Sequence, residues 1–403
     1  MGTIAGCEVT TNGIGTPSSW ILPPDSSFRR EADRPKPFRP DDFEENFDAH
    51  TILYDCFRLQ EGQVMMIAPP LAKFGGVLDS LVIESLPSGS RCQFTTRHQF
   101  RQCRVTVNVR ESDSALYVRS AAGEAVIDVR PNGCEAFRGR RVLFTLSKDN
   151  HPKWICDWMR FHRDVHSADA VLLYDNGSTS YTVEALLEAM RKVRGFKAIS
   201  VVEWPYKYGP QGINGWHWDS NFCQDGALED ARWRYLASAD AVLNIDIDEL
   251  VLSDHGDAFE RAARSSRSYV QFSGRWVIAS DEGPFSQSVR GETGSNVARH
   301  KESSSQLLPH WRWGKLRPQD KNLCPKKWAV VPERCPASAQ WSVHVILGVR
   351  GQKLALGDTS YRHFRQINTN WKYRRSDAGT VECQRTKRDT TLLEAFGRVC
   401  WDA

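Results

Sequence analysis

Several features that would assign this chain to a class at once are missing from its sequence. The first residues, MGTIAGCEVTTNG, contain neither the basic nor the apolar region of a secretory signal peptide. No apolar run is long enough to span a bilayer, and Gly6 stands where a myristoylation motif needs Ser or Thr. We therefore expect a cytoplasmic protein, which lies at the periphery of a membrane if its substrates are there.

Paired cysteines and a strong net charge are also missing. The eleven cysteines form no C-x-x-C pair, which argues against a zinc ribbon or a disulfide framework and for free thiols in a reducing compartment. The net charge of +4 does not suggest bulk nucleic-acid binding. The 403 residues, 40% of them hydrophobic, suffice for two domains or for one large domain with an appendage.

What the chain does contain changes twice along its length. Residues 1–48 are rich in proline and charge, which predicts an irregular N-terminal arm. Residues 49–139 hold short β-branched runs such as CRVTVNVRES, separated by turn residues, which predicts a β-rich, sandwich-like domain. Over residues 140–403 strand patterns alternate with helical stripes, which predicts an α/β domain with a mostly parallel, Rossmann-like sheet.

Polar segments follow the predicted strands of this third part. One helix is predicted in HPKWICDWMRFHRDV and another in SYTVEALLEAMRKVRG, with Ser180 as its N-cap and Gly195 as its stop. Ligands bind beyond the carboxyl ends of strands in such sheets. We therefore expect residues 148–150, 175–178 and 246–249 to line one crevice.

The segment DAVLNIDIDELVL predicts a fourth strand that carries three carboxylates. Residues i and i+2 of a strand share a face, so Asp246 and Asp248 are expected to face the crevice while Glu249 points away. Adjacent carboxylates repel one another unless a cation offsets them, and Mg²⁺ or Mn²⁺ commonly takes one or two carboxylates plus phosphates. A solvated strand end is the alternative, and the flanking apolar runs disfavour it.

Three further residues have two interpretations each. In LLYDNGST, Asp175 is either a turn residue or an acceptor for a base or ribose group. His344 in WSVHVI and His363 in YRHFRQ are either core histidines or additional ligands.

Taken together, these segments resemble the GT-A glycosyltransferases, most closely the branch around families 2 and 92. Members of that branch carry DNGS on the second strand and DIDEF at the metal site, and this chain has LLYDNGST and NIDIDEL in the same order. NHPKWICDWMRFH is similar to the opening of that branch at Asn150, Trp158 and His162. The resemblance covers roughly residues 141–373 and leaves out the β-rich part.

The resemblance implies a hexosyltransferase that uses a nucleotide-diphosphate sugar, UDP-linked, as donor and a glycan or other hydroxyl as acceptor, as in polysaccharide biosynthesis. It also implies inversion at the sugar. Asp248 would bind Mn²⁺ or Mg²⁺, and Asp246 would bind the metal, a water on it, or the ribose. His344 or His363 would complete the metal shell or contact the diphosphate.

The resemblance further implies that Asp175 holds the nucleobase or ribose, with Asn150 and Asn176 in the same nucleotide-binding region. A carboxylate base would activate the acceptor hydroxyl. Asp281 and Glu282, in FSGRWVIASDEGPF, are the candidates because they follow the next predicted strand; a solvated loop is the alternative for both.

The sequence leaves other classes to weigh against glycosyl transfer. An aspartyl-nucleophile phosphatase would have Thr or Val at position 250, where this chain has Leu250. A nucleotidyltransferase would begin with a Gly-rich phosphate loop, which TLSKDNHPK lacks. A non-catalytic carbohydrate- or nucleotide-binding protein could use the fourteen tryptophans as stacking platforms, but the pair Asp246 and Asp248 argues against it. For the β-rich domain, acceptor binding and a scaffold role both stay open.

Overall fold

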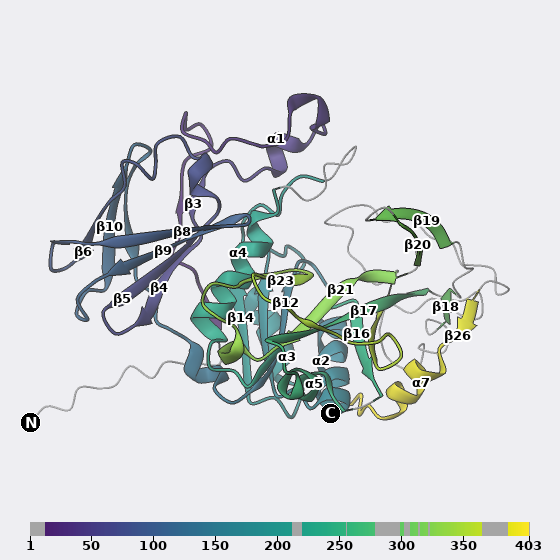
Figure 1. Cartoon of the computed structure of the whole chain (residues 1–403). Coiled ribbons are helices and arrows are strands. Elements are labelled where there is room, and N and C mark those ends of the chain that lie inside the picture. Colours follow the sequence, from purple (N-terminus) through teal and green to yellow (C-terminus); the bar gives the residue numbers. More distant parts are fainter. Residues whose placement is uncertain are drawn as a thin grey trace, which may run out of the picture.

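The structure is a computed structural model in which an antiparallel β-sandwich precedes an α/β body (Figure 1). It describes residues 13–211, 220–254, 256–278, 299–301, 307–312, 315–320, 323–364 and 386–402.

The sandwich consists of two four-stranded antiparallel sheets, as the alternating runs predict. Apolar side chains from both sheets, such as Val64, Val105, Leu116 and Ile127, form a core between them. The first sheet has the order β4 (Asp55–Gln60), β5 (Gln63–Ala68), β9 (Gln102–Asn108) and β8 (Phe94–Gln99). The second has the order β11 (Gly123–Asp128), β10 (Ala115–Ser120), β6 (Val82–Leu86) and β7 (Ser90–Arg91).

The body is built on a twelve-stranded sheet whose first part is parallel. The parallel strands are, in spatial order, β1 (Ile14–Gly15), β14 (Ala198–Glu203), β13 (Ala170–Asp175), β12 (Arg141–Ser147) and β15 (Ala241–Asn244). The sheet continues with antiparallel neighbours, β21 (Leu323–Val330), β17 (Tyr269–Ile278), β18 (Arg299–Lys301) and β26 (Thr386–Arg388). β16 (Glu249–Ser253), β24 (Gln352–Lys353) and β25 (Thr359–Phe364) join beside β17. The prediction of a mostly parallel α/β sheet after a β-rich domain is confirmed.

Helices cover both faces of this sheet. One face packs against α2 (Pro152–His166), α3 (Val183–Arg191), α5 (Ala258–Arg264) and α7 (Thr390–Gly397). The other face packs against α4 (Phe222–Asp230), which is followed by a π-helical turn, and against the sandwich. Alternate residues of β12 explain this division, because Leu143 enters the first core and Val142 and Phe144 enter the second.

Short elements complete the described chain. They are α1 (Phe43–Asn46) and the two-stranded pairs β2 (Trp20–Ile21) with β3 (Thr51–Leu53), β19 (Leu307–Arg312) with β20 (Lys315–Asp320), and β22 (Gln340–Ser342) with β23 (Val345–Leu347). The segment predicted as an irregular arm thus contributes β1 to the edge of the large sheet, where Ile14 pairs with Val201.

Two local predictions are wrong. The predicted fourth strand is two strands, because β15 ends at Asn244 and β16 begins only at Glu249. The chain turns between them, where the Glu249 N–H donates to the carbonyl oxygen of Asp246 at 3.1 Å. The N-cap of α3 is Thr182 rather than Ser180, since the Thr182 hydroxyl accepts from the Ala185 N–H at 3.2 Å.

Buried ion pairs link the sandwich to the body. Arg104 pairs with Glu229 at 3.1 Å, Arg101 with Asp225 at 3.6 Å, and Asp55 with Arg234 at 2.6 Å. The carboxylate side chains of all three pairs are fully buried. We call these six residues the interface cluster. Burial raises the pKa of Asp225 to about 6, against the opposing effects of its bonds to Ser342 and Arg101.

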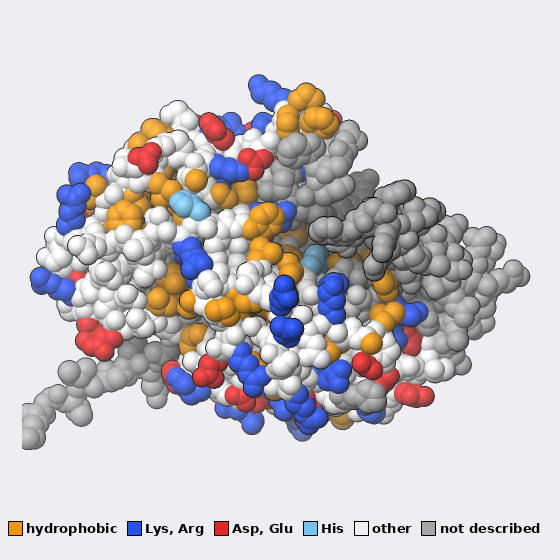
Figure 2. Space-filling model, viewed as in Figure 1, with side chains coloured by type: hydrophobic (Ala, Val, Ile, Leu, Met, Phe, Trp, Pro, Cys, Tyr) orange, Lys and Arg blue, Asp and Glu red, His pale blue; other side chains and the backbone are white. Residues whose placement is uncertain are grey.

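The outer surface shows mixed charge. On the face seen in Figure 2, basic and acidic side chains are interspersed along the lower rim of the body. Of the helices in the described ranges, none is long and apolar enough to cross a membrane.

Candidate active site

The polar segments after β12, β13 and β15 lie at one edge of the sheet. Ser147 of β12 is in register with Asp175 of β13, and Phe144 of β12 is in register with Asn244 of β15. The strands β13 and β15 flank β12, so their ends are two strand spacings, roughly 10 Å, apart. The parallel sheet therefore brings the segments around residues 148, 176 and 246 to one edge.

A tight turn carries Asp246 and Asp248. Ile245 and Ile247 are buried, whereas the two aspartates between and after them are partly exposed. The Glu249 carboxylate closes the turn by accepting from the Asp246 N–H at 3.0 Å. Burial of the two isoleucines fixes the turn and directs both aspartates outward, although the turn is not a strand.

Lys327 of β21 lies against this turn. Its Nζ is 2.8 Å from Asp246 Oδ2 and 3.0 Å from Glu249 Oε2, and the side chain is 1% exposed. Burial by itself would lower the pKa of Lys327, but the two carboxylates outweigh it and hold the pKa above its usual value. The lysine therefore offsets part of the negative charge of the turn.

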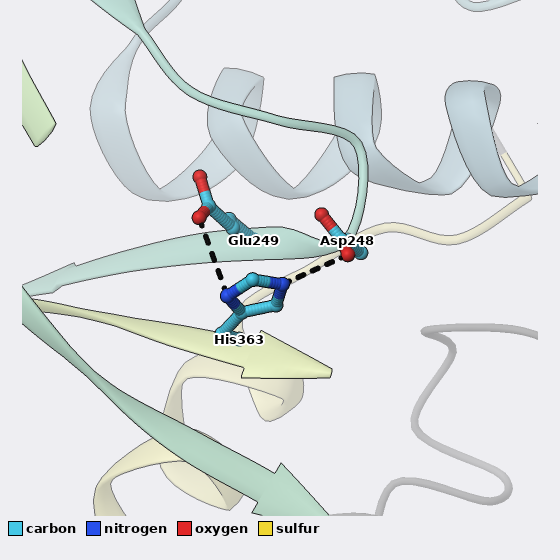
Figure 3. A group of neighbouring side chains, drawn as sticks. All are labelled: Asp248, Glu249 and His363. Carbon is cyan, nitrogen blue, oxygen red and sulfur yellow. Dashed lines mark hydrogen bonds and ion pairs between the residues drawn. The ribbon is translucent and has the colours of Figure 1, made fainter. Parts of the chain in front are cut away.

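His363 of β25 lies between the carboxylates of Asp248 and Glu249 (Figure 3). Its Nε2 is 2.9 Å from Asp248 Oδ2, and its Nδ1 is 3.5 Å from Glu249 Oε1. The ring of Trp276 stacks on the imidazole, with centroids 4.1 Å apart and planes at 24°. We call Asp246, Asp248, Glu249, Lys327 and His363 the site cluster.

Glu249 belongs to this cluster, and the prediction that it points away is wrong. That prediction assumed an unbroken strand through the DIDE segment, and the turn removes its basis. Burial raises the pKa of Glu249, and Lys327 opposes the shift. The sequence signal was a carboxylate placed directly before the apolar run LVL, since a buried carboxylate needs a partner.

Asp248, Glu249 and His363 form a donor set that suits a hard divalent cation. One ligand atom from each lies within 4.8 Å of the others. Adjacent ligands of an octahedral ion with bonds of about 2.1 Å lie roughly 3 Å apart, close to the 2.9 Å between Asp248 Oδ2 and His363 Nε2. Glu249 lies at the other ring nitrogen, where a carboxylate typically orients a metal-binding histidine. The residues therefore fit Mn²⁺ or Mg²⁺.

The DNGS segment forms a compact turn. The Asp175 carboxylate, which is buried, accepts from the Ser178 N–H at 2.9 Å and from its hydroxyl at 2.6 Å. The Asn176 amide donates to the carbonyl oxygens of Trp204 at 2.7 Å and Tyr206 at 2.8 Å. Burial raises the pKa of Asp175, and the bonds from Ser178 oppose the shift. These contacts make both side chains supports of the turn.

Two neighbours support the same turn from the end of β12. Asp149, whose φ is +55°, accepts through Oδ1 from the backbone N–H groups of Thr179 at 2.6 Å and Ser180 at 2.9 Å. Burial would raise the pKa of Asp149, but these bonds outweigh it and lower the pKa. Asn150 donates to the Ser147 hydroxyl at 3.0 Å. The sequence placed residues 148–150 at this edge but gave Asp149 no contact with the turn, because these partners are about thirty residues away in sequence.

Three other predicted residues are not part of the donor group that the structure describes. His344 is exposed, its Nδ1 is 2.9 Å from the Lys326 carbonyl oxygen, and it is not among the three grouped donors. The candidate bases Asp281 and Glu282 lie outside the described residues.

A pocket of about 490 Å³ opens at the same edge of the sheet, beyond β12, β13 and β14. It combines lysine, tyrosine and amide side chains with backbone of the DNGS turn, a mixture suited to a ribonucleoside. Its wall also includes two residues at α1, in the N-terminal arm. The lining residues are Asp42, Asn46, Lys148, Asn176, Gly177, Pro205, Tyr206, Lys207, Tyr208, Gly209 and Gln211.

The carboxylate–histidine cluster and the pocket both lie at the carboxyl edge of the α/β sheet, where ligands bind in such folds. Sequence comparison identifies the family. The sequence profile of glycosyltransferase family 92 matches residues 147–395, more than half of the chain. The chain belongs to glycosyltransferase family 92, one of the two families that the sequence resembles. No curated protein sequence matches it significantly.

Solved structures give distant likenesses. HddC from Yersinia pseudotuberculosis is 9% identical over 53% of this chain and 89% of its own, with a TM-score of 0.27. S. aureus TarS 1-349 is 11% identical over 56% and 60%, with a TM-score of 0.30. The galactosyltransferase LgtC, solved with donor and acceptor sugar analogs, is 15% identical over 48% and 58%, with a TM-score of 0.23. Scores this low add no argument about the site.

Proposed function

We propose that this protein transfers a hexosyl group from a UDP-linked sugar to a hydroxyl of a glycan acceptor, with inversion and with a divalent cation at the site cluster. The observation that carries the proposal is the Asp248–Glu249–His363 group at the carboxyl edge of a family 92 sheet. Polysaccharide biosynthesis is the setting that such a reaction serves.

Within the site cluster the residues divide the work. Asp248 and His363 would hold Mn²⁺ or Mg²⁺, and the ion would supply Lewis-acid neutralisation of the departing diphosphate. Glu249, whose Oε1 is 3.5 Å from His363 Nδ1, would orient the ring from its other side. Lys327 holds Asp246 at 2.8 Å, so Asp246 is drawn toward the lysine and away from the ring of His363.

The pocket beside the DNGS turn would receive the nucleoside. The Asp175 carboxylate is engaged inside the turn, and the Asn176 amide donates to the carbonyl oxygens of Trp204 and Tyr206. We therefore propose that these two residues shape the pocket wall and that neither side chain binds the nucleotide directly. Lys148 and Lys207 line the pocket and would face the negative charge of the nucleotide. An acceptor-activating carboxylate completes the reaction, and Asp281 and Glu282 are its sequence candidates.

The β-sandwich is proposed as a scaffold for the body. Its arginines 101 and 104 satisfy carboxylates of α4 that would otherwise be buried without a charge partner. The competing proposal is that the sandwich binds the acceptor. Measuring acceptor affinity in a folded variant with a changed sandwich surface would test it.

Titration calorimetry tests the donor half of the proposal. The protein is titrated with UDP in the presence of Mn²⁺ and then of EDTA, and a panel of UDP-sugars is assayed for transfer. We expect UDP binding that needs Mn²⁺ and turnover of one or more donors. UDP binding that Mn²⁺ does not strengthen would refute the metal role. Binding without any transfer, with a panel of glycan acceptors present, would favour a non-catalytic binding protein. Conversion of a UDP-sugar and added pyrophosphate to UTP and sugar 1-phosphate would favour a nucleotidyltransferase.

A further inference from the structure

The strand that carries the site has an edge without a neighbouring strand. In the described part of the sheet β16 pairs only with β25, and α2 packs along its other side. Phe364 N–H donates to the Asp248 carbonyl oxygen, and Glu249 is opposite His363. Hydrogen-bonded and non-hydrogen-bonded pairs alternate along an antiparallel ladder, so Val251 falls in a non-hydrogen-bonded pair. Its N–H and C=O therefore point toward α2.

Two histidines of α2 meet these two backbone groups. His162 Nε2 accepts from the Val251 N–H at 3.4 Å, and His166 Nε2 lies 2.7 Å from the Val251 carbonyl oxygen. The residues are four apart, so they lie one helical turn apart on one face, and their rings stack with centroids 5.7 Å apart. Both side chains are fully buried.

The other ring nitrogens fix opposite tautomers. His162 Nδ1 lies 2.9 Å from the Trp158 carbonyl oxygen, so it carries the proton and leaves Nε2 as an acceptor. His166 Nδ1 accepts from the Ala258 N–H at 3.2 Å, so the proton is on Nε2, which donates to Val251. Burial is the main cause that lowers the pKa values of His162 and His166, to about 3 and about 4. Both rings are neutral, as the contacts require.

We propose that His162 and His166 are positioning residues that replace a neighbouring strand at Val251 and thereby hold β16, with Asp248 and Glu249 at its start, in register with His363. This inference rests on the proposed function. Neither histidine touches the site cluster, so their effect passes through the backbone of β16. A backbone N–H and C=O buried against α2 without partners would carry an uncompensated desolvation cost, and apolar side chains in α2 could not satisfy them.

Phenylalanine and glutamine substitutions separate this role from simple core filling. His162→Phe and His166→Phe fill similar space but cannot bond to Val251. His162→Gln and His166→Gln keep an acceptor and a donor near the positions of Nε2. Met190→Ala, a fully buried change in α3, serves as the control for general destabilisation.

Mn²⁺ affinity, measured from the electron paramagnetic resonance signal of the free ion, is the first readout. We expect each Phe variant to bind Mn²⁺ about 10- to 100-fold more weakly, the range found when a residue behind a metal ligand is lost. The Gln variants should recover most of this loss, and Met190→Ala should bind as the wild type does. Unchanged Mn²⁺ affinity in both Phe variants would overturn the proposal, as would an equal loss in Met190→Ala.

Hydrogen exchange and histidine NMR make the outcome independent of the proposed function. Exchange at residues 249–253 should quicken in the Phe variants and not in Met190→Ala. In the wild type, ¹⁵N shifts at pH 6 should report two neutral rings with opposite tautomers. If the wild type binds no Mn²⁺, the proposed function fails, while exchange and the ring shifts still decide whether the histidines hold β16. Charged rings in the wild type at pH 6, or unchanged exchange at residues 249–253 in folded Phe variants, would overturn the proposal.

Discussion

The site cluster and the interface cluster use the same kinds of side chain for different ends. In the interface cluster each of the carboxylates Asp55, Asp225 and Glu229 has its own arginine, and all three are fully buried. In the site cluster three carboxylates share one lysine and a histidine, and Asp246 and Asp248 are 28% and 14% exposed. Buried carboxylates that each have an arginine partner hold two parts of a protein together. Carboxylates that outnumber their cationic partners and are open to solvent can bind a metal cation.

This difference also explains why sequence located one cluster and not the other. The site carboxylates are adjacent in DIDE, so their excess of charge is visible in the sequence. The interface partners Arg104 and Glu229 are more than a hundred positions apart. The comparison predicts that changes in the interface cluster cost stability and changes in the site cluster cost binding.

The largest expected effect is on stability, at the interface. Arg104→Met leaves Glu229 buried without its charge partner, which should lower the free energy of unfolding by about 3–5 kcal/mol. Urea denaturation measures it, and the affinity for Mn²⁺ should stay unchanged. The control is Arg104→Met combined with Glu229→Leu, which removes both charges and should recover part of the loss. A single variant as stable as the wild type would break the comparison.

The next effect is on binding, at the site. Asp248→Asn should weaken Mn²⁺-dependent UDP binding by about 100-fold or more, because it removes a charged ligand next to His363. The free energy of unfolding should change by less than about 1 kcal/mol, since the side chain is partly exposed. Asp254→Asn, at the far end of β16, is the matched control for calorimetry. Equal UDP affinity in Asp248→Asn and the wild type would contradict the metal site.

The third effect is on the pH dependence of stability. His162 and His166 have pKa values lowered to about 3 and about 4 in the folded protein, against about 6.5 in the unfolded chain. Between these values the unfolded chain binds more protons, so their contribution is present above pH 6.5 and is lost as the pH falls toward 4. The slope is about 1.4 kcal/mol per pH unit for each histidine.

The pH prediction is tested by comparing the stability of the wild type with that of a variant in which Gln replaces both histidines. Asp225, with its pKa raised to about 6, gives the opposite slope between about pH 4 and 6, and it is common to both. The neighbours of His166, Asp257 and Arg398, are also unchanged. The variant with both histidines replaced by Gln should therefore lose less stability than the wild type between pH 6.5 and 4.5. Parallel stability curves would show that the histidines do not titrate as predicted.

The smallest effect is at the start of α3. Thr182→Ala removes the side chain that caps the helix, which should cost about 1 kcal/mol of stability. UDP binding should not change, because Thr182 has no contact with the site cluster. Ser180→Ala instead removes a hydroxyl that donates to Asp149 at 2.9 Å, next to the pocket turn. An unchanged melting temperature of the protein in Thr182→Ala would contradict its role as the cap.

Much of the fold could be predicted from periodicity. Alternating runs predicted the sandwich strands, and the strand–helix alternation predicted the parallel half of the sheet, because burial on one face or both leaves a regular pattern. The break after Asn244 could not be predicted, since Ile245 and Ile247 continue the apolar pattern of β15 through the turn. The Glu249 carboxylate, three residues along, and the tertiary contact from Lys327 hold that turn.

The candidate site was predictable only where its charges are neighbours in sequence. Asp246 and Asp248 stand out between apolar residues, and the late His363 follows a strand pattern. Lys327 completes the site cluster from β21, and Trp276 of β17 stacks on His363. Nothing local marks either residue as a partner of DIDE. His162 likewise reads as one of several polar residues in α2, and only the pairing of β16 reveals its contact with Val251.

The most direct test of the account is a crystal structure of the protein soaked with UDP and Mn²⁺, with anomalous diffraction to locate the ion. We predict a single Mn²⁺ bonded to the Asp248 carboxylate and to His363 Nε2, with Glu249 on the other ring nitrogen and the nucleoside in the pocket beside the DNGS turn. An ion bound away from Asp248, or UDP bound at full occupancy with no ion near His363, would contradict it.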